Sequence, residues 1–154
     1  FGRFIFSKCD PWCEVRYMLS IQISWAAVFI AALINMVLGA LWYSPLLFGN
    51  VWLKLVKIDP KKMDMKKGAR RGYIVSALMS VVMAIVLSLL IQATGSLSPL
   101  GGAMIGLLIW VGFCVTMMIS PVLWENKPLQ GYAINIGYHL VSLVAMGAVI
   151  GAFA

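Results

Sequence analysis

The sequence predicts an all-α integral membrane protein, a four-helix transmembrane bundle, and two observations carry that prediction. Of the 154 residues, 62% are hydrophobic and 11% are charged, whereas soluble domains carry about 25% charged residues. The charges are also confined, because residues 17–53, 72–124 and 128–154 contain none. A helix needs about 20 apolar residues to cross a hydrocarbon core of roughly 30 Å. The three tracts therefore hold one, two and one crossings, which excludes an ordinary soluble enzyme.

The transmembrane domain is expected to cover residues 18–154. Its spans are expected at about residues 24–47, 73–93, 100–123 and 132–153. The middle tract divides at Thr94–Pro99, where turn-forming residues separate two apolar segments. Transmembrane β-strands would alternate apolar and polar residues, but residues 81–87 are continuously apolar. Helices are therefore expected, and they satisfy their backbone polar groups internally, as the bilayer requires.

Basic residues predict the orientation of the chain. Eight of the twelve Lys and Arg residues lie between the first and second spans, and basic residues in short loops stay on the cytoplasmic side. We therefore expect a plasma-membrane protein with this connector inside and both chain ends outside. The connector lacks interleaved stacking aromatic residues, so we expect it to attract anionic lipid headgroups rather than nucleic acid. The basic residues expected at the headgroups are Lys61, Lys62, Lys66, Lys67, Arg70 and Arg71.

Residues 1–17 form a polar tail that is expected on the non-cytoplasmic side. Met18 is a plausible native start, because it leads directly into the first span. Cys9 and Cys13 would face an oxidising compartment, where a disulfide can form. Their spacing is not Cys-x-x-Cys, so it indicates neither a zinc knuckle nor a thioredoxin-type centre. Cys114 lies within the third span and is interpreted as a small buried apolar residue.

Small residues mark faces on three of the spans where another helix can pack. Such residues let helix backbones approach closely in lipid. The first span repeats small and polar residues at intervals of four, and the third and fourth spans each carry a Gly-x-x-x-Gly motif. We expect these faces to contact helices of the same chain or of another chain. The residues are Ala27, Ala31, Asn35, Gly39 and Tyr43, then Gly102 and Gly106, then Gly147 and Gly151.

The fourth span carries a polar stripe made of Asn135, Tyr138, His139 and Ser142. Polar groups at membrane depth are usually partnered and turned inward, so together with Asn35 this stripe predicts an intramembrane polar site. We interpret His139 as a neutral imidazole that is hydrogen-bonded to a neighbouring helix. Two alternatives stay open: the imidazole lines a substrate or proton path, or it ligates a haem, a chlorophyll or a metal. No resident cofactor and no metal is expected.

Three segments of the sequence resemble a known family. They are residues 39–49 (GALWYSPLLFG) with Trp52, residues 110–113 (WVGF) and residues 135–140 (NIGYHL). With them, residues 18–154 resemble the small four-span membrane proteins called DUF1761, a domain of unknown function. The resemblance implies a four-helix membrane fold and supplies no activity. The family-motif residues it marks are Gly39, Trp42, Tyr43, Ser44, Pro45, Trp110, Gly112 and Phe113.

The positions of these motifs suggest two roles for the aromatic pair at the inner end of the first span. Trp42 and Tyr43 are interpreted as anchors at the membrane interface, where aromatic side chains are enriched. The alternative is one wall of an inward-facing pocket that the stripe from Asn135 to His139 closes from the side.

The sequence favours a non-enzymatic protein. Its five acidic residues all lie outside the expected spans, and neither paired carboxylates nor a nucleophile with its base can be assembled. We expect a homo-oligomer or an accessory subunit of a larger membrane complex. The first alternative is a small-molecule or ion transporter or channel, formed by oligomerisation and lined by Asn35, Asn135, His139 and Ser142. The second is a haem or chlorophyll carrier that uses His139.

Overall fold

The computed structural model describes residues 23–56 and 65–153, and this part of the chain is made of helices and short turns. The helical segments are α2 (Trp25–Trp42), α3 (Gly49–Val56), α4 (Met65–Ala93), α5 (Pro99–Ile109), the π-helical η1 (Trp110–Val115), α6 (Thr116–Met118), α7 (Ser120–Trp124) and α8 (Leu129–Ala152). Four stretches are long and apolar enough to cross a membrane: Trp25–Trp42, Arg70–Ala93, Pro99–Trp124 and Leu129–Ala152. The prediction of an all-helical, multi-pass membrane protein with four long apolar helices is confirmed for the described residues.

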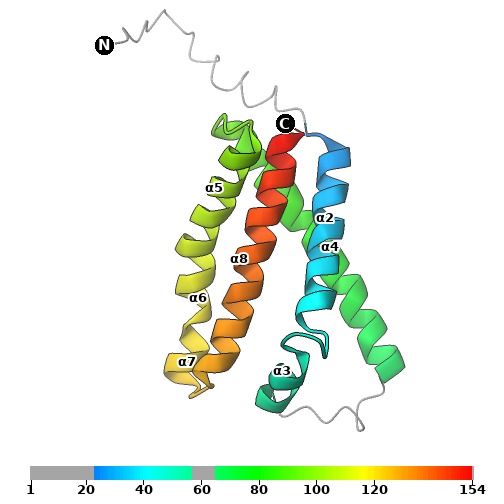
Figure 1. Ribbon diagram of the computed structural model, residues 1–154, viewed down its shortest axis with the longest axis vertical. Coiled ribbons are helices and arrows are strands. Elements are labelled where there is room, and N and C mark those ends of the chain that lie inside the picture. Colours follow the sequence, from blue (N-terminus) through cyan, green and yellow to red (C-terminus); the bar gives the residue numbers. More distant parts are fainter. Residues whose placement is uncertain (1–22, 57–64, 154) are drawn as a thin grey trace, which may run out of the picture.

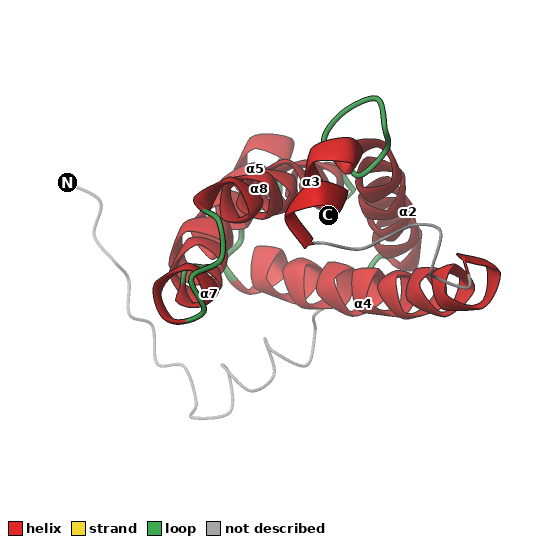
Figure 2. Ribbon diagram, turned by 90° about the horizontal axis from the view of Figure 1, so that it is seen from below, coloured by secondary structure: helices red, strands yellow, loops and turns green. Residues whose placement is uncertain are grey.

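Helix α8 lies at the centre of the molecule. Its upper half packs against α5, and it also contacts η1, α2 and α4. In Figure 1, α5, η1, α6 and α7 form one column beside α8, while α2 lies on the other side. Viewed from below, α5, α8 and α2 form a row, and α4 runs along one side of that row (Figure 2). We call the end with the turn at residues 94–98 the upper end and the end with α3 the lower end, as in Figure 1.

The hydrophobic core lies in the upper half, where α2, α4 and α8 meet. Its buried members are Val28, Ala31, Ala32, Ala84, Leu87, Ile91, Met146 and Ile150. The lower half of α4 differs, because Tyr73, Ile74 and Leu78 are exposed by 54–61%. Helix α4 is therefore packed against its neighbours at the upper end and largely uncovered towards the lower end.

The first span ends at Trp42, so the expected end at residue 47 is wrong. The residue before a proline disfavours helical backbone, and proline lacks the N–H that would continue the ladder, so Ser44 and Pro45 terminate the helix. The chain then reverses, with the Gly49 N–H donating to the Ser44 carbonyl oxygen at 2.9 Å. A side chain at Gly49 would overlap the backbone of this turn. The turn leads into α3, a short helix that lies within the expected connector between the first and second spans.

The other spans begin and end within a few residues of the expected positions, except that α4 begins at Met65, inside the basic connector. Lys66 and Lys67 belong to its first turn, and Arg70 and Arg71 are exposed. The expected tail at residues 1–17 with its two cysteines, the start at Met18, and two connector lysines all lie outside the described residues. The cysteines are Cys9 and Cys13, and the lysines are Lys61 and Lys62.

Candidate functional site

Two tryptophans hold the lower half of α8 from opposite sides. The indole N–H of Trp42 on α2 donates to the carbonyl oxygen of Ile134 at 3.0 Å. The indole N–H of Trp110 in η1 donates to the carbonyl oxygen of Ile136 at 2.8 Å. Gly137 leaves room for this approach, because a Cβ there would lie 3.2 Å from the Trp42 ring. The family-motif tryptophans therefore fix α8 between the first and third spans.

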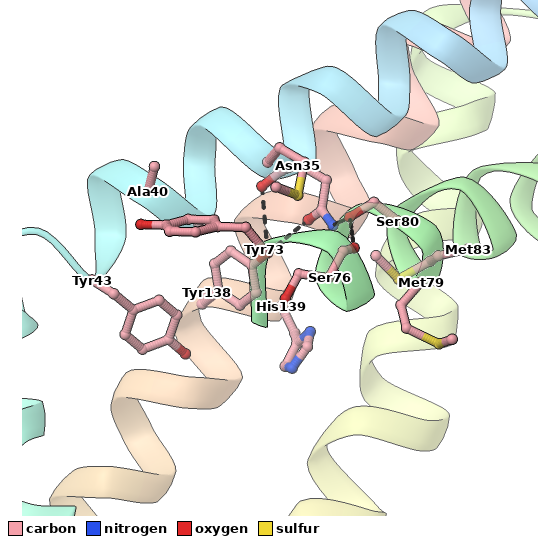
Figure 3. Close-up of a pocket in the computed structure, with 12 residues that line it drawn as sticks. Asn35, Ala40, Tyr43, Tyr73, Ser76, Met79, Ser80, Met83, Tyr138 and His139 are labelled. Atoms are coloured by element: carbon pink, nitrogen blue, oxygen red, sulfur yellow. Dashed lines mark hydrogen bonds between the residues drawn. The ribbon is translucent and has the colours of Figure 1, made fainter. Parts of the chain in front are cut away.

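A chain of hydrogen bonds joins α8, α2 and α4 near the middle of their apolar spans (Figure 3). The Tyr138 hydroxyl donates to the side-chain oxygen of Asn35 at 2.9 Å. The Asn35 amide donates to the Ser80 hydroxyl at 2.7 Å, and that hydroxyl donates to the Ser76 carbonyl at 2.8 Å. Asn35 and Ser80 are only 6% and 2% exposed. Buried polar groups require such partners, so this network sets how α2, α4 and α8 lie relative to one another.

The network forms part of the wall of a cleft of about 450 Å³, which we call the α4 cleft. Three helices contribute to it (Figure 3). Among the described residues, the side chains that line the cleft are all uncharged and include three methionines. They are Asn35, Met36, Gly39, Ala40 and Tyr43 from α2 and its end, Tyr73, Ser76, Met79, Ser80 and Met83 from α4, and Tyr138 and His139 from α8.

His139 lies in this cleft with its ring partly exposed. The imidazole packs against Tyr138 with ring centroids 5.0 Å apart, and Figure 3 shows it pointing away from the Asn35 network. The hydrogen bond to a neighbouring helix that we expected from the sequence is not found among the described residues. The imidazole nitrogens are therefore free, within this part of the chain, to bond to a molecule in the cleft.

Tyr43 lies just beyond the end of α2, at the lower end of the cleft. Its hydroxyl donates to the side-chain oxygen of Asn135 at 2.9 Å. Its ring contacts Tyr138 on one side and Trp52 of α3 on the other, each with centroids 5.5 Å apart. Burial, with a smaller contribution from Tyr138, raises the pKa of Tyr43 to about 12. The phenol is therefore protonated even at moderately alkaline pH, and it can donate to Asn135 throughout that range.

A second cavity of about 540 Å³, the lower cavity, lies between α3, the end of the third span and α8. Asn135 lines it, together with Trp52 and Tyr132. The Tyr132 hydroxyl donates to the Val115 carbonyl oxygen at 3.0 Å, at the end of η1. The remaining walls of the lower cavity are mostly apolar. They are made by Leu55, Met117, Met118, Pro121, Val122, Lys127, Pro128 and Gly131.

The two Gly-x-x-x-Gly motifs face each other across the interface of α5 and α8. A Cβ at Gly102 would overlap the carbonyl oxygen of Gly147, and a Cβ at Gly147 would overlap that of Gly102. The other two glycines, Gly106 and Gly151, lie equally close to backbone carbonyls of the opposing segment. We call these four residues the glycine seam. They bring the two backbones into direct contact in the upper half of the bundle.

The structure separates the remaining candidate residues from the cleft. Ser142 is fully buried in the upper half of α8, and its hydroxyl has no partner among the described residues. Ser44 bonds its own helix end through the Leu41 carbonyl at 2.7 Å. Gly112 faces open space and Phe113 is 62% exposed, both on the third span.

Sequence reasoning missed the serines of α4 that complete the site. A signal for them exists, since Ser76, Ser80, Ala84 and Ser88 follow one another at intervals of four. This stripe of small residues matches the one on the first span, and the structure places the two helices in contact. The methionines of the cleft gave no comparable signal, because methionine is an ordinary residue of apolar helices.

Comparison with known proteins adds a family and no activity. A family model described as "Protein of unknown function (DUF1761)" matches residues 26–151. No curated protein and no solved structure matches the sequence. The matched range includes every residue that lines the α4 cleft and the lower cavity.

Proposed function

The chain belongs to the DUF1761 family of proteins of unknown function, and from the geometry of its site we propose that it is a non-enzymatic membrane protein that binds a small uncharged molecule in the α4 cleft. One observation carries the proposal. A cleft of about 450 Å³ lies between three apolar helices, and hydrogen-bonding groups without charge line it. Binding sites for small molecules have this character, with apolar walls and a few placed polar groups.

The lining of the cleft defines the chemistry of the ligand. A charged molecule would lose its hydration without gaining an opposite charge, which is costly at membrane depth. The polar groups that the cleft offers to a ligand include the His139 imidazole and the hydroxyls of Ser76 and Tyr73. The three methionine side chains adapt to apolar groups of irregular shape. These groups suit an amphipathic molecule with a neutral hydrogen-bonding head and an apolar remainder.

The position of α4 supports entry of the ligand from the bilayer. Tyr73 and Met79 line the cleft and are also 61% and 59% exposed on the surface of the bundle. The rim of the cleft therefore reaches the membrane-facing side of α4. A molecule dissolved in the bilayer can approach along this side without crossing the headgroups.

Photolabelling tests this proposal. The protein would be reconstituted in phosphatidylcholine nanodiscs with a diazirine-bearing monoacylglycerol, whose glycerol head is uncharged. The expected result is label on Met83, which is only partly exposed, localised by tandem mass spectrometry. His139→Leu should carry about threefold less label there, because one hydrogen-bonding partner is lost. A diazirine fatty acid with the same chain should label this residue weakly, because its carboxylate meets no cation there.

Two controls decide whether such label reports the cleft. Thr116→Ala removes a hydroxyl that bonds only its own helix, at Gly112 and Phe113, and should leave the label unchanged. Leu78, 59% exposed on the lipid-facing side, measures label acquired from the bulk bilayer. Equal labelling of Leu78 and Met83, or no loss of label in His139→Leu, would refute the proposal.

Self-association is the second candidate function, and the third span favours it. Gly112 meets nothing within 4 Å of an added Cβ, beside the exposed Phe113 on the same segment. A small residue that faces the membrane next to a large one is suited to receive a helix of a second copy. Native mass spectrometry in mild detergent would detect the oligomer, and Gly112→Leu should convert it to a monomer of about the chain mass of 16.9 kDa. A monomeric wild type would remove this candidate.

We further propose that the lower end faces the cytoplasm of the plasma membrane. Lys54, Arg70 and Arg71 are exposed at this end, which suits the positive-inside rule and contact with anionic lipids. The test uses a variant without native cysteines and a membrane-impermeant maleimide applied to intact cells. Ser96→Cys should be labelled and Lys127→Cys should not, and the reverse pattern would invert the proposed orientation.

A further inference from the structure

One hydrogen bond joins a residue that lines the α4 cleft to a residue that lines the lower cavity. Tyr43 lines the α4 cleft, Asn135 lines the lower cavity, and the Tyr43 hydroxyl donates to the Asn135 side chain at 2.9 Å. The ring of Tyr43 extends this link, because it contacts Tyr138 of the cleft and Trp52 of the lower cavity. Figure 3 shows Tyr43 next to Tyr138 at one end of the cleft.

The link is built from parts that can move. Tyr43 caps the end of α2, where no following helical turn limits the directions open to its side chain. The bond joins two uncharged groups, and such bonds are weaker than bonds to ions. By contrast, the neighbouring Trp42 is held on the α8 backbone, at the carbonyl of Ile134. Trp42 can therefore hold the end of α2 against α8 while the Tyr43 side chain changes its position.

The lower cavity offers the same uncharged chemistry as the cleft. Its one cation, among the described residues, is Lys127, which pairs with Glu125 at 2.7 Å at the exposed rim. Tyr132 already donates to the Val115 carbonyl. When Tyr43 turns away, the side-chain oxygen of Asn135 loses its donor, and its amide can then bond to a ligand that carries both a donor and an acceptor. A neutral head with a hydroxyl meets this requirement.

We infer that the lower cavity is a second binding site for the same uncharged amphipathic ligand, and that the Tyr43–Asn135 pair is the gate between the two sites. This inference rests on the proposed function of the cleft. Opening the gate joins cavities of about 450 and 540 Å³ into one path from the side of α4 to the lower end of the bundle.

The photolabelling assay tests the gate through a ratio. The label on Met118 of the lower cavity is divided by the label on Met83 of the cleft, because both side chains are only partly exposed. Tyr43→Phe keeps the ring and removes the hydroxyl, so the ratio should rise about threefold or more, because the closed state loses its hydrogen bond. Asn135→Leu removes the acceptor from the other helix and should raise the ratio in the same direction.

Ser44→Ala is the matched control, because it removes a hydroxyl beside the gate that bonds only the Leu41 carbonyl. Its ratio should equal that of the wild type. An unchanged ratio in both gate variants, with the cleft still labelled, would overturn the gate and leave the proposed function standing. A wild-type cleft without label would overturn the proposed function and this inference with it.

Discussion

The two halves of α8 contact their neighbours in opposite ways. In the upper half, Gly147 and Gly151 bring its backbone directly onto α5, and apolar side chains fill the space towards α2 and α4. In the lower half, Tyr138 bonds to Asn35 of α2 and Asn135 bonds to Tyr43 just beyond the end of α2, both through side chains, and two cavities remain between the helices. The comparison teaches that one helix can carry both the rigid part of a membrane bundle and its binding part.

The difference has a physical origin in the side chains of each half. Backbones in contact leave no space for a ligand and gain dispersion energy along the whole seam. Aromatic and amide side chains hold helices further apart, and they bond through flexible groups. The upper half is therefore closely packed, and the lower half, which is joined through side chains, leaves space for the two cavities.

The largest predicted effect comes from filling the glycine seam. In Gly147→Ala, the new methyl group overlaps the backbone of α5 at Gly102, so the two helices must separate. We expect a loss of about 3 kcal/mol in the free energy of unfolding. This value is among the larger costs of overpacking, because the group in the way is a backbone, which cannot move aside as a flexible side chain can. Thermal unfolding in dodecyl maltoside, followed by circular dichroism, measures this loss.

Gly72→Ala is the matched control for the seam. A Cβ at Gly72 meets nothing within 4 Å, and alanine is a better helix former than glycine by roughly 0.5–1 kcal/mol. This variant should be as stable as the wild type or slightly more stable. Equal destabilisation by the two substitutions would show that the seam does not hold the upper half together.

The same comparison explains how far the sequence could predict the structure. The seam was visible as two Gly-x-x-x-Gly motifs, because small residues in apolar helices have one main use. That Gly102 meets Gly147 within one chain was left open, since the motif does not encode its partner. The cleft was visible through Asn35 and the stripe on α8, because amide and imidazole groups are rare at membrane depth.

Other features of the lower half could not be predicted from the sequence. Ser76 and Ser80 escaped notice because a serine can bond its own helix and then needs no partner. The end of the first span was placed five residues too late, since Leu46 and Leu47 continue the apolar run past Pro45. The α4 cleft depends on how α4 lies against α2 and α8, and the lower cavity depends on how α3 lies against α8 and the end of the third span. Both are properties of the whole bundle.

The second largest effect is expected in the polar network of the lower half. Asn35→Leu removes the side-chain oxygen that accepts from Tyr138 and the amide that donates to Ser80. Ser80 keeps its bond to the Ser76 carbonyl, and Tyr138 keeps only a longer contact of 3.4 Å to the backbone carbonyl of residue 35. Buried polar groups that lose a partner cost about 1–3 kcal/mol, so we expect a loss of about 2 kcal/mol in the same unfolding measurement. Asn50→Leu is the control, because its bond to the Pro45 carbonyl is exposed and 3.3 Å long. A loss in Asn35→Leu no larger than in this control would place the stability of the bundle entirely in the upper half.

A smaller effect is expected from alkaline pH at the gate. The pKa of Tyr43 is raised to about 12 in the folded protein, against about 10 for a free tyrosine. Between these values the unfolded chain loses this proton first, so the contribution of Tyr43 is complete below pH 10 and declines as the pH rises to 12. The stability difference between wild type and Tyr43→Phe should therefore shrink over this interval. A difference that stays constant from pH 9 to pH 11.5 would mean that the phenol is not protected in the fold.

The smallest effect distinguishes two buried serines, one in each half. Ser80 accepts a hydrogen bond from Asn35 in the lower half, and its replacement by alanine should cost about 1 kcal/mol. Ser142 lies in the upper half with no partner for its hydroxyl among the described residues, so Ser142→Ala should be neutral or stabilise the protein by up to about 1 kcal/mol. Both variants remove a hydroxyl oxygen from a fully buried position on a transmembrane helix. The difference between their unfolding free energies therefore measures what the hydrogen-bond partners of Ser80 contribute. If Ser142→Ala cost as much as Ser80→Ala, the upper half would also depend on polar contacts, and the contrast between the two halves of α8 would disappear.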